Sequence, residues 1–159
     1  MNETDLTILK ILKETKTIVC VGVSPKTVRP SYFVARYLHY KGFKIIPINP
    51  RYVGKTLFGE EILGSISDVN PSTKVDMLDI FRKSETVLPI VNEGLQHLKS
   101  LKTIWMQIGV FNEEASLLAK NSGLNVIQNR CPKIEYQRLF GELRMSGFNT
   151  GIISSRLHI

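Results

Sequence analysis

Basic side chains recur in the short segments that directly follow five apolar runs of this chain. They are Lys26, Arg29, Arg51, Arg82, Lys83, Arg130 and Lys133. The same five segments, at 22–31, 49–51, 81–84, 109–112 and 129–133, hold no aspartate or glutamate. Guanidinium and ammonium groups gathered without carboxylates are typical of a site for a ligand with several phosphates, although exposed loops can also be basic by chance. We favour the phosphate site, because the ends of parallel strands are where α/β folds bind their ligands.

The elements that would position these cations can be predicted from hydrophobic patterning. Short apolar, β-branched runs predict strands at 17–23, 43–49, 75–81, 103–108 and 124–128. Amphipathic segments predict helices at 5–14, 31–41, 84–98 and 112–122. Residues 52–69 contain glycines and no helical periodicity, so we expect a long loop there.

This alternation of strands and helices predicts the fold class. It indicates βαβ units, and therefore an α/β chain that forms a single doubly wound, Rossmann-like domain over 1–159. We expect a five-stranded parallel sheet in the order 3-2-1-4-5 with helices on both faces. Residues 1–16 would form an N-terminal helix, and the apolar tail 141–159 would dock on the domain or on a partner subunit, such as a second copy of the chain.

Composition limits the class of protein. The chain has 159 residues, 43% of them hydrophobic and 22% charged, which is typical of a globular domain and excludes collagen and coiled coil. No apolar stretch approaches the roughly 20 residues that span a bilayer, so no membrane partner is expected. The N-terminus lacks the pattern of a signal peptide, and two cysteines form no disulfide framework. We therefore expect a cytoplasmic protein.

The positive charge is uneven along the chain. Of a net charge of +7, residues 1–60 carry ten basic and four acidic side chains. Such an excess attracts nucleic acid or a small polyanion, or it only improves solubility. No pattern of an RNA-binding or helix-turn-helix module accompanies it, so a nucleic-acid-binding module is a remote alternative.

The segments after the first two predicted strands distinguish among nucleotide ligands. Only Gly22 is present of the glycines in the dinucleotide-binding fingerprint, although Ser24, Ser31 and free N–H groups at the next helix could still hold an anion. NAD sites usually place a carboxylate at the end of the second strand, but here Asn49, Pro50 and Arg51 follow it. This segment suits a phosphorylated ribose, as found in both NADP and coenzyme A, and the residues alone do not choose between them.

Several stretches together resemble the coenzyme A-binding protein family. They are VGVSPKTVRPSYFVARYL (21–38), KIIPINPR (44–51), VDMLDIFRKSETVLPIVNE (75–93), WMQIGVFNEEA (105–115), NRCPKIEY (129–136) and GFNTGIISSR (147–156). The family is similar to the nucleotide-binding domain of succinyl-CoA synthetase α subunits and of ADP-forming acetyl-CoA synthetases. The resemblance implies a Rossmann-like domain that holds coenzyme A across its strand ends.

The resemblance also implies a set of site residues. The pyrophosphate would be lined by Gly22, Val23, Ser24 and Lys26. That loop would be closed at the helix start by Arg29, Pro30 and Ser31. The adenosine and its 3′-phosphate would meet Asn49, Pro50 and Arg51. The adenine side and the pantetheine path would be walled by Ile80, Phe81 and Arg82. The pantetheine end would lie toward Gln107, Gly109, Asn129, Arg130 and Cys131.

Candidates for catalysis are few. The synthetase relatives act through a phosphorylated histidine in a further domain, and we expect no such domain in this chain. We expect structural or neutral roles for His39, His97 and His158. No metal-ligand spacing is present, so no metal site is expected. A structural hydrogen bond or ion pair is expected for Asp76 and for Asp79.

Cys131 is the exception, because it ends a strand beside Arg130 and Lys133. Basic neighbours lower the pKa of a thiol, so a mixed disulfide with coenzyme A is conceivable. Simple packing before Pro132 is the interpretation that we favour.

We therefore predict non-catalytic or weakly catalytic binding of coenzyme A or an acyl-CoA. The runner-up is a small NADP-dependent oxidoreductase, which is disfavoured because no hydride-transfer site is evident.

Overall fold

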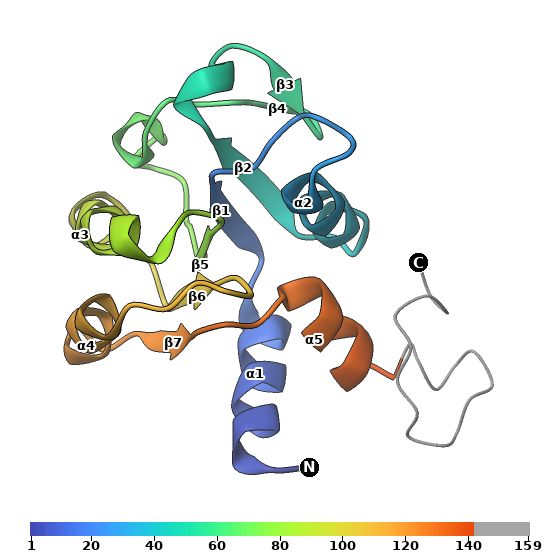
Figure 1. The fold of residues 1–159 in the computed structure, drawn as a ribbon, viewed down its shortest axis with the longest axis vertical. Helices are drawn as coiled ribbons and strands as arrows, with labels where there is room; N and C mark the ends of the chain where they lie inside the picture. Colours follow the sequence, from blue (N-terminus) through green and yellow to red (C-terminus); the bar gives the residue numbers. More distant parts are fainter. Residues whose placement is uncertain (142–159) are drawn as a thin grey trace.

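A parallel sheet of five strands forms the centre of the computed structural model, which describes residues 1–141 (Figure 1). The strands are β1 (Thr17–Val21), β2 (Lys44–Ile48), β5 (Met77–Ile80), β6 (Thr103–Met106) and β7 (Asn125–Ile127). Every residue of β5 and β6 is buried, as expected for strands that are covered on both faces. The expected docking of the tail falls on residues 142–159, outside the described part.

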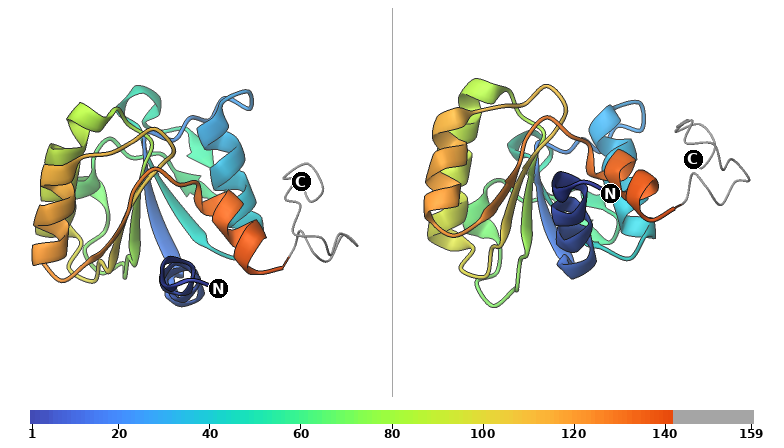
Figure 2. Two further views of the ribbon diagram at one scale, coloured as in Figure 1. Left: turned by 60° about the horizontal axis from the view of Figure 1, so that its bottom comes forward. Right: turned by 90° about the horizontal axis from the view of Figure 1, so that it is seen from below.

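Helices cover both faces of the sheet (Figure 2). They are α1 (Glu3–Glu14), α2 (Pro30–Tyr40), α3 (Val87–His97), α4 (Glu113–Asn121) and α5 (Pro132–Leu139). One apolar cluster joins the sheet to α3 and α4, and a second joins its other face to α1, α2 and α5. The predicted Rossmann-like α/β class is thereby confirmed. Within residues 1–141, no helix is long and apolar enough to cross a membrane.

The strand order differs from the expected 3-2-1-4-5 in one place. The observed order is β2-β1-β5-β6-β7, so the third main strand, β5, pairs with β1 on the side away from β2. The position beyond β2 is held by a single parallel bridge between Ile48 and Leu63. Leu63 belongs to the segment expected to be a loop. The Rossmann order appears only if this bridge is counted as a strand, and one bridge has no hydrophobic pattern that could predict it.

Short elements fill the segment between β2 and β5. They are the 3-10 turn η1 (Pro50–Tyr52), β3 (Thr56–Leu57), β4 (Glu60–Glu61) and the 3-10 turn η2 (Ile66–Asp68). The helix expected from residue 84 begins as a separate 3-10 turn, η3 (Ser84–Thr86). Pro89 therefore lies in the first turn of α3, where its missing N–H costs no helical hydrogen bond.

Helix α5 was not predicted from the sequence. Its buried residues are Pro132, Glu135 and Gln137, and two polar side chains among them hide the helical hydrophobic pattern. Arg138 joins this helix to α1, because its Nη2 lies 2.7 Å from a carboxylate oxygen of Asp5 and 2.7 Å from one of Glu135.

Candidate functional site

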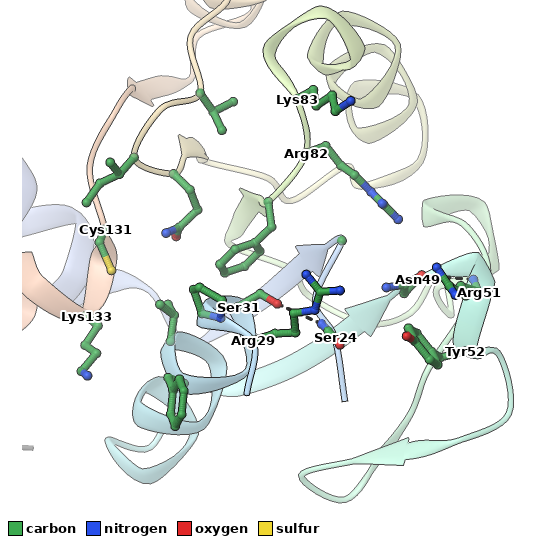
Figure 3. A pocket seen from close by; sticks show the side chains of 18 of the residues that line it. Ser24, Arg29, Ser31, Asn49, Arg51, Tyr52, Arg82, Lys83, Cys131 and Lys133 are labelled. Carbon is green, nitrogen blue, oxygen red and sulfur yellow. Dashed lines mark hydrogen bonds between the residues drawn. The ribbon is translucent and has the colours of Figure 1, made fainter. Parts of the chain in front are cut away.

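A cavity of about 1130 Å³ opens at the carboxyl ends of the parallel strands (Figure 3). Twelve of the residues that line it are among the site residues expected from sequence: Gly22, Ser24, Arg29, Pro30, Ser31, Asn49, Pro50, Arg51, Phe81, Arg82, Gln107 and Cys131. Eight more were not in that set: Phe33, Val34, Tyr52, Lys83, Ile108, Val110, Lys133 and Ile134. The cavity therefore receives side chains from the loops after β1, β2, β5 and β6 and from the starts of α2 and α5.

Gly22 lets the loop after β1 pass close to the loop after β5. Its φ of +91° lies in the left-handed region, and a Cβ there would stand 2.9 Å from the carbonyl oxygen of Phe81 and 3.0 Å from Nε of Arg82. Only glycine tolerates both the positive φ and the close approach of the loop after β5. The backbone at Gly22 therefore allows the Arg82 side chain to lie against the loop after β1.

The rest of that loop is held by its own serines. Ser31 Oγ accepts a hydrogen bond from the N–H of Ser24 at 3.0 Å, and Ser24 Oγ accepts one from the N–H of Lys26 at 3.1 Å. Helix α2 begins at Pro30 without a side-chain cap. Its N-terminus faces the cavity with the partial positive charge that favours anions.

Asn49 joins the loops after β1 and β2. It is buried, its Nδ2 donates to the carbonyl oxygen of Val23 at 2.9 Å, and its Oδ1 accepts from the N–H of Arg51 at 3.1 Å. Both polar atoms of the amide are thus engaged within the protein. Asn49 orders the backbone around Arg51, whose guanidinium lies 5.9 Å from the ring centroid of Tyr52.

One end of the cavity is strongly basic. Figure 3 shows the side chains of Arg29, Arg51 and Arg82 converging from three loops near Ser24 and Asn49, with Lys83 beyond Arg82. Among the described residues that line the cavity there is no carboxylate or histidine. Within residues 1–141, none of these three arginines forms an ion pair.

The other end carries fewer cations. Cys131 and Lys133 lie there in Figure 3, away from the arginines. The lining also contains Phe33, Ile108 and Ile134, which are 46%, 61% and 36% exposed. The three arginines thus lie at one end of the cavity, whereas Cys131 and the cation Lys133 lie at the other.

A buried carboxyl group lies behind this lining. Asp79, in β5, is fully buried, and burial raises its pKa well above the usual range. Gln107 follows β6 and lines the cavity. When its amide is oriented so that the nitrogen faces the carboxyl group, Nε2 lies 3.0 Å from Oδ1 and 3.2 Å from Oδ2 of Asp79. Burial also raises the pKa of the Cys20 thiol, and the neighbouring Asp79 acts in the same direction.

The structure corrects the expectation that basic neighbours lower the pKa of Cys131. Only 6% of this residue is exposed, and burial raises the pKa of its thiol. The N–H groups of Lys133 and Ile134 and the side chain of Gln107 oppose that shift without reversing it. Cys131 is therefore a thiol rather than a thiolate at neutral pH.

Three of the expected site residues do not line the cavity; two lie in the loop after β1 and one is the last residue of β5. Val23 and Ile80 are fully buried in the core, because side chains alternate between the two faces of an extended segment. Lys26 is exposed on the loop after β1 and does not line the cavity.

The remaining three expected residues organise loops instead of lining the cavity. The Oδ1 of Asn129 accepts a hydrogen bond from the N–H of Gly109 at 2.7 Å, which joins the loops after β6 and β7. Arg130 faces Glu135 of α5, with 3.2 Å between Nη1 and Oε1. The indole N–H of Trp105 donates to the carbonyl oxygen of Arg130 at 2.8 Å.

Only some of the lining residues outside the predicted set could have been recognised from the sequence. Lys83 and Lys133 stood among the basic residues after the predicted strands. Phe33 and Ile134 come from the first turns of helices, where a hydrophobic side chain ordinarily indicates packing. Within residues 1–141, no group of three histidine, cysteine or acidic side chains is placed to hold a metal ion.

Comparison with known proteins places the chain in a family. A model of the family described as "CoA binding domain" matches residues 16–137. A curated protein of Bacillus subtilis (strain 168), "Uncharacterized protein YneT", is 30% identical over 135 residues, which are 85% of this chain and 96% of that protein.

Solved structures show the same similarity. A protein from Thermus thermophilus is 35% identical with a TM-score of 0.80 and covers 88% of this chain and 100% of its own. A dinucleotide-forming acetyl-coenzyme A synthetase of Ca. Korarchaeum cryptofilum is 26% identical with a TM-score of 0.59; the match covers 74% of this chain and 26% of the synthetase. The family match spans most of the chain, and the chain therefore belongs to the CoA-binding domain family.

Proposed function

We propose that this protein binds coenzyme A, or an acyl-CoA, in the cavity at the carboxyl ends of its parallel strands. The convergence of Arg29, Arg51 and Arg82 on one end of that cavity carries the proposal. Coenzyme A carries a pyrophosphate and a ribose 3′-phosphate close together, and arginine is the side chain best suited to phosphate oxygens. The family membership supports the same ligand.

The polarity of the cavity supports one direction of binding. The nucleotide end of coenzyme A would lie among the arginines, beside the loop after β1 and the N-terminus of α2. The uncharged pantetheine arm would extend past Phe81 toward Gln107 and Cys131. Apolar side chains at this end would also contact an acyl group on the sulfur.

The proposal is of a binding protein rather than an enzyme. In the described part of the chain, the lining residues include neither a histidine nor a carboxylate, which are the usual general acids and bases. The buried thiol of Cys131 lacks a partner that would ionise it.

A thermal-shift series with coenzyme A, dephospho-coenzyme A, NADP and NAD at equal concentration tests the proposal. A ligand at 100 times its dissociation constant stabilises a protein by about 2.7 kcal/mol, which is readily measured. We expect the largest shift with coenzyme A and a smaller one with the dephospho form. A shift with NADP alone would favour the oxidoreductase, and no shift with any of the four would contradict the proposal.

The variant Arg51→Ala sharpens this test. Loss of a charge-assisted hydrogen bond should weaken coenzyme A binding about tenfold or more. It should also reduce the difference between coenzyme A and its dephospho form, if Arg51 meets the 3′-phosphate. Arg36→Ala is the matched control, because Arg36 is exposed on α2 and does not line the cavity. Equal effects of the two substitutions would count against a local role for Arg51.

A further inference from the structure

The carboxyl group of Asp79 stands where an apolar side chain would be expected. Its neighbours in β5 are Met77, Leu78 and Ile80, which are all fully buried. Burial of a carboxyl group costs free energy unless hydrogen bonds compensate for it. An explanation is therefore needed for why this position carries one.

Within residues 1–141, the hydrogen bonds available to the Asp79 carboxyl come from the side chain of Gln107. Nε2 of Gln107 lies 3.0 Å and 3.2 Å from its two oxygens, and Asp79 takes part in no ion pair. Burial raises the pKa of Asp79, and Asp79 in turn raises the pKa of two neighbouring thiols, those of Cys20, from β1, and Cys131, from the segment before α5. Neither thiol is a cation that could stabilise a buried carboxylate.

Asp76, three residues earlier, shows what a structural aspartate looks like in this chain. Its Oδ2 accepts hydrogen bonds from the backbone N–H groups of Lys16 and Thr17, at 2.9 Å and 3.0 Å. These bonds join the start of β1 to the segment before β5. Among the described residues, no backbone donor contacts Asp79 in this way, and the side chain that it contacts, Gln107, lines the cavity.

We propose that Asp79 is a positioning residue, which holds Nε2 of Gln107 and so presents Oε1 of Gln107 to a hydrogen-bond donor on the pantetheine arm of the bound ligand. This inference rests on the proposed function. A free glutamine amide could turn either its oxygen or its nitrogen toward the ligand. Here Nε2 lies against both oxygens of Asp79, so even the protonated carboxyl group offers it a carbonyl acceptor and leaves Oε1 for the ligand. Pantetheine offers amide N–H groups and a terminal thiol as donors.

Isothermal titration of two ligands tests the proposal. Adenosine 3′,5′-bisphosphate has the adenosine and 3′-phosphate of coenzyme A but no pantetheine arm. Asp79→Leu should weaken coenzyme A binding roughly threefold to tenfold, the worth of one hydrogen bond, and leave the affinity for the bisphosphate unchanged. Asp79→Asn retains an acceptor oxygen and should restore most of the coenzyme A affinity.

Two further variants separate positioning from stability. Asp76→Asn should lower the midpoint of thermal unfolding while leaving the affinities for both ligands unchanged. Gln107→Leu should reproduce the effect of Asp79→Leu on coenzyme A, and the double variant should lose no more than either single one. Because Gln107 is at the cavity wall, its variant keeps the test available if Asp79→Leu does not fold.

The outcomes distinguish the two proposals. If the wild-type protein does not bind coenzyme A, the proposed function fails and this inference fails with it. If the wild-type protein binds coenzyme A but Asp79→Leu and Gln107→Leu bind it equally well, only the positioning role is overturned. An equal loss of affinity for both ligands would also overturn it, because the effect would then not concern the pantetheine arm.

Discussion

Like charges meet at the basic end of the cavity without a carboxylate among them. Arg29, Arg51 and Arg82 reach it from three separate loops and form no ion pair within the described residues. Their mutual repulsion is unfavourable in the free protein and is relieved when a polyanion binds. At the scale of residues, the site is therefore shaped to favour a bound anion over the empty state.

The close approach at Gly22 gives a prediction about stability. Gly22→Ala should destabilise the fold by more than Gly42→Ala, since both residues have positive φ but only Gly22 has atoms within 4 Å of an added Cβ. The left-handed conformation alone costs about 1–2 kcal/mol, and the clash with Phe81 adds roughly 1–3 kcal/mol. Urea unfolding of the two variants measures the difference, and equal losses would show that the loops separate without cost.

The raised pKa of Asp79 predicts how stability changes with pH. The folded chain keeps a proton on Asp79 that the unfolded chain releases above about pH 4, so this group makes the protein less stable as pH rises from there toward the folded-state pKa. The loss is at most about 1.4 kcal/mol per pH unit. Urea unfolding at pH values from about 5 to about 8 should show that the free energy of unfolding of Asp79→Asn rises relative to that of the wild type as pH rises. Parallel curves for the two proteins would contradict this.

Residues at the site were predictable to the extent that they follow strands. The rule that ligands bind at strand ends gave Arg29, Arg51 and Arg82, which line the cavity. The rule could not exclude Ile80, because side chains alternate between the two faces of a strand and the rule does not say which of them face the cavity. The rule also could not include Ile134, which belongs to α5. That helix was not predicted, because polar residues on its buried face interrupt the hydrophobic pattern.

At the scale of elements, the loops at the carboxyl edge brace one another. Asn112 caps α4 by accepting from the N–H of Ala115 at 2.9 Å, and its Nδ2 donates to the carbonyl oxygen of Ser84 at 2.9 Å. The N–H of Phe111 donates to Ser84 Oγ at 3.0 Å. The loops after β5 and β6 are thus fixed together, next to the cavity wall formed by Lys83 and Val110.

Loss of this bracing should be measurable. Asn112→Ala removes the cap and the bond to Ser84 together, so we expect a loss of about 1–2 kcal/mol in the free energy of unfolding. Asn2→Ala is the matched control, because Asn2 caps α1 through one exposed bond to the N–H of Asp5. Chemical denaturation of both variants should show the smaller loss at Asn2. A loss at Asn112 no greater than that at Asn2 would argue against a role in joining the loops.

The predictability of the elements followed the strength of their patterns. Helix α4, which was expected at 112–122, lies at Glu113–Asn121, and the apolar runs predicted all five strands of the main sheet. The bridge at Leu63 and the helix α5 lacked such patterns, because their stability comes from tertiary contacts. The strand order depends on that bridge, so it could not be read from the sequence.

At the scale of the whole molecule, basic side chains line the cavity but also lie elsewhere on the chain. Residues 1–60, which hold most of the net charge of +7, supply Arg29 and Arg51 to the cavity, but they also carry Lys16 and Lys44 at the amino ends of β1 and β2. The cavity itself is lined by five cations and, among the described residues, by no carboxylate. The field of this region should attract a polyanion before contact, and the attraction should weaken as salt screens it.

This predicts a salt-dependent association rate. Stopped-flow measurement of coenzyme A binding should show the association rate constant falling about tenfold or more as ionic strength rises from roughly 0.05 M to 0.5 M. The dissociation rate constant should change much less, since the short-range contacts remain. An association rate that ignores salt would mean that the charge excess serves only solubility.

The bridge between Ile48 and Leu63 has a consequence beyond strand order. It places the β3–β4 hairpin against the free edge of β2, and the opposite edge strand, β7, has only three residues. An exposed long edge strand has unpaired backbone N–H and C=O groups, so a strand of another chain can pair with it and aggregation can begin there. The chain therefore offers little backbone for such pairing along β2, and its resistance to aggregation at high concentration depends on a hairpin that lies outside the ligand site.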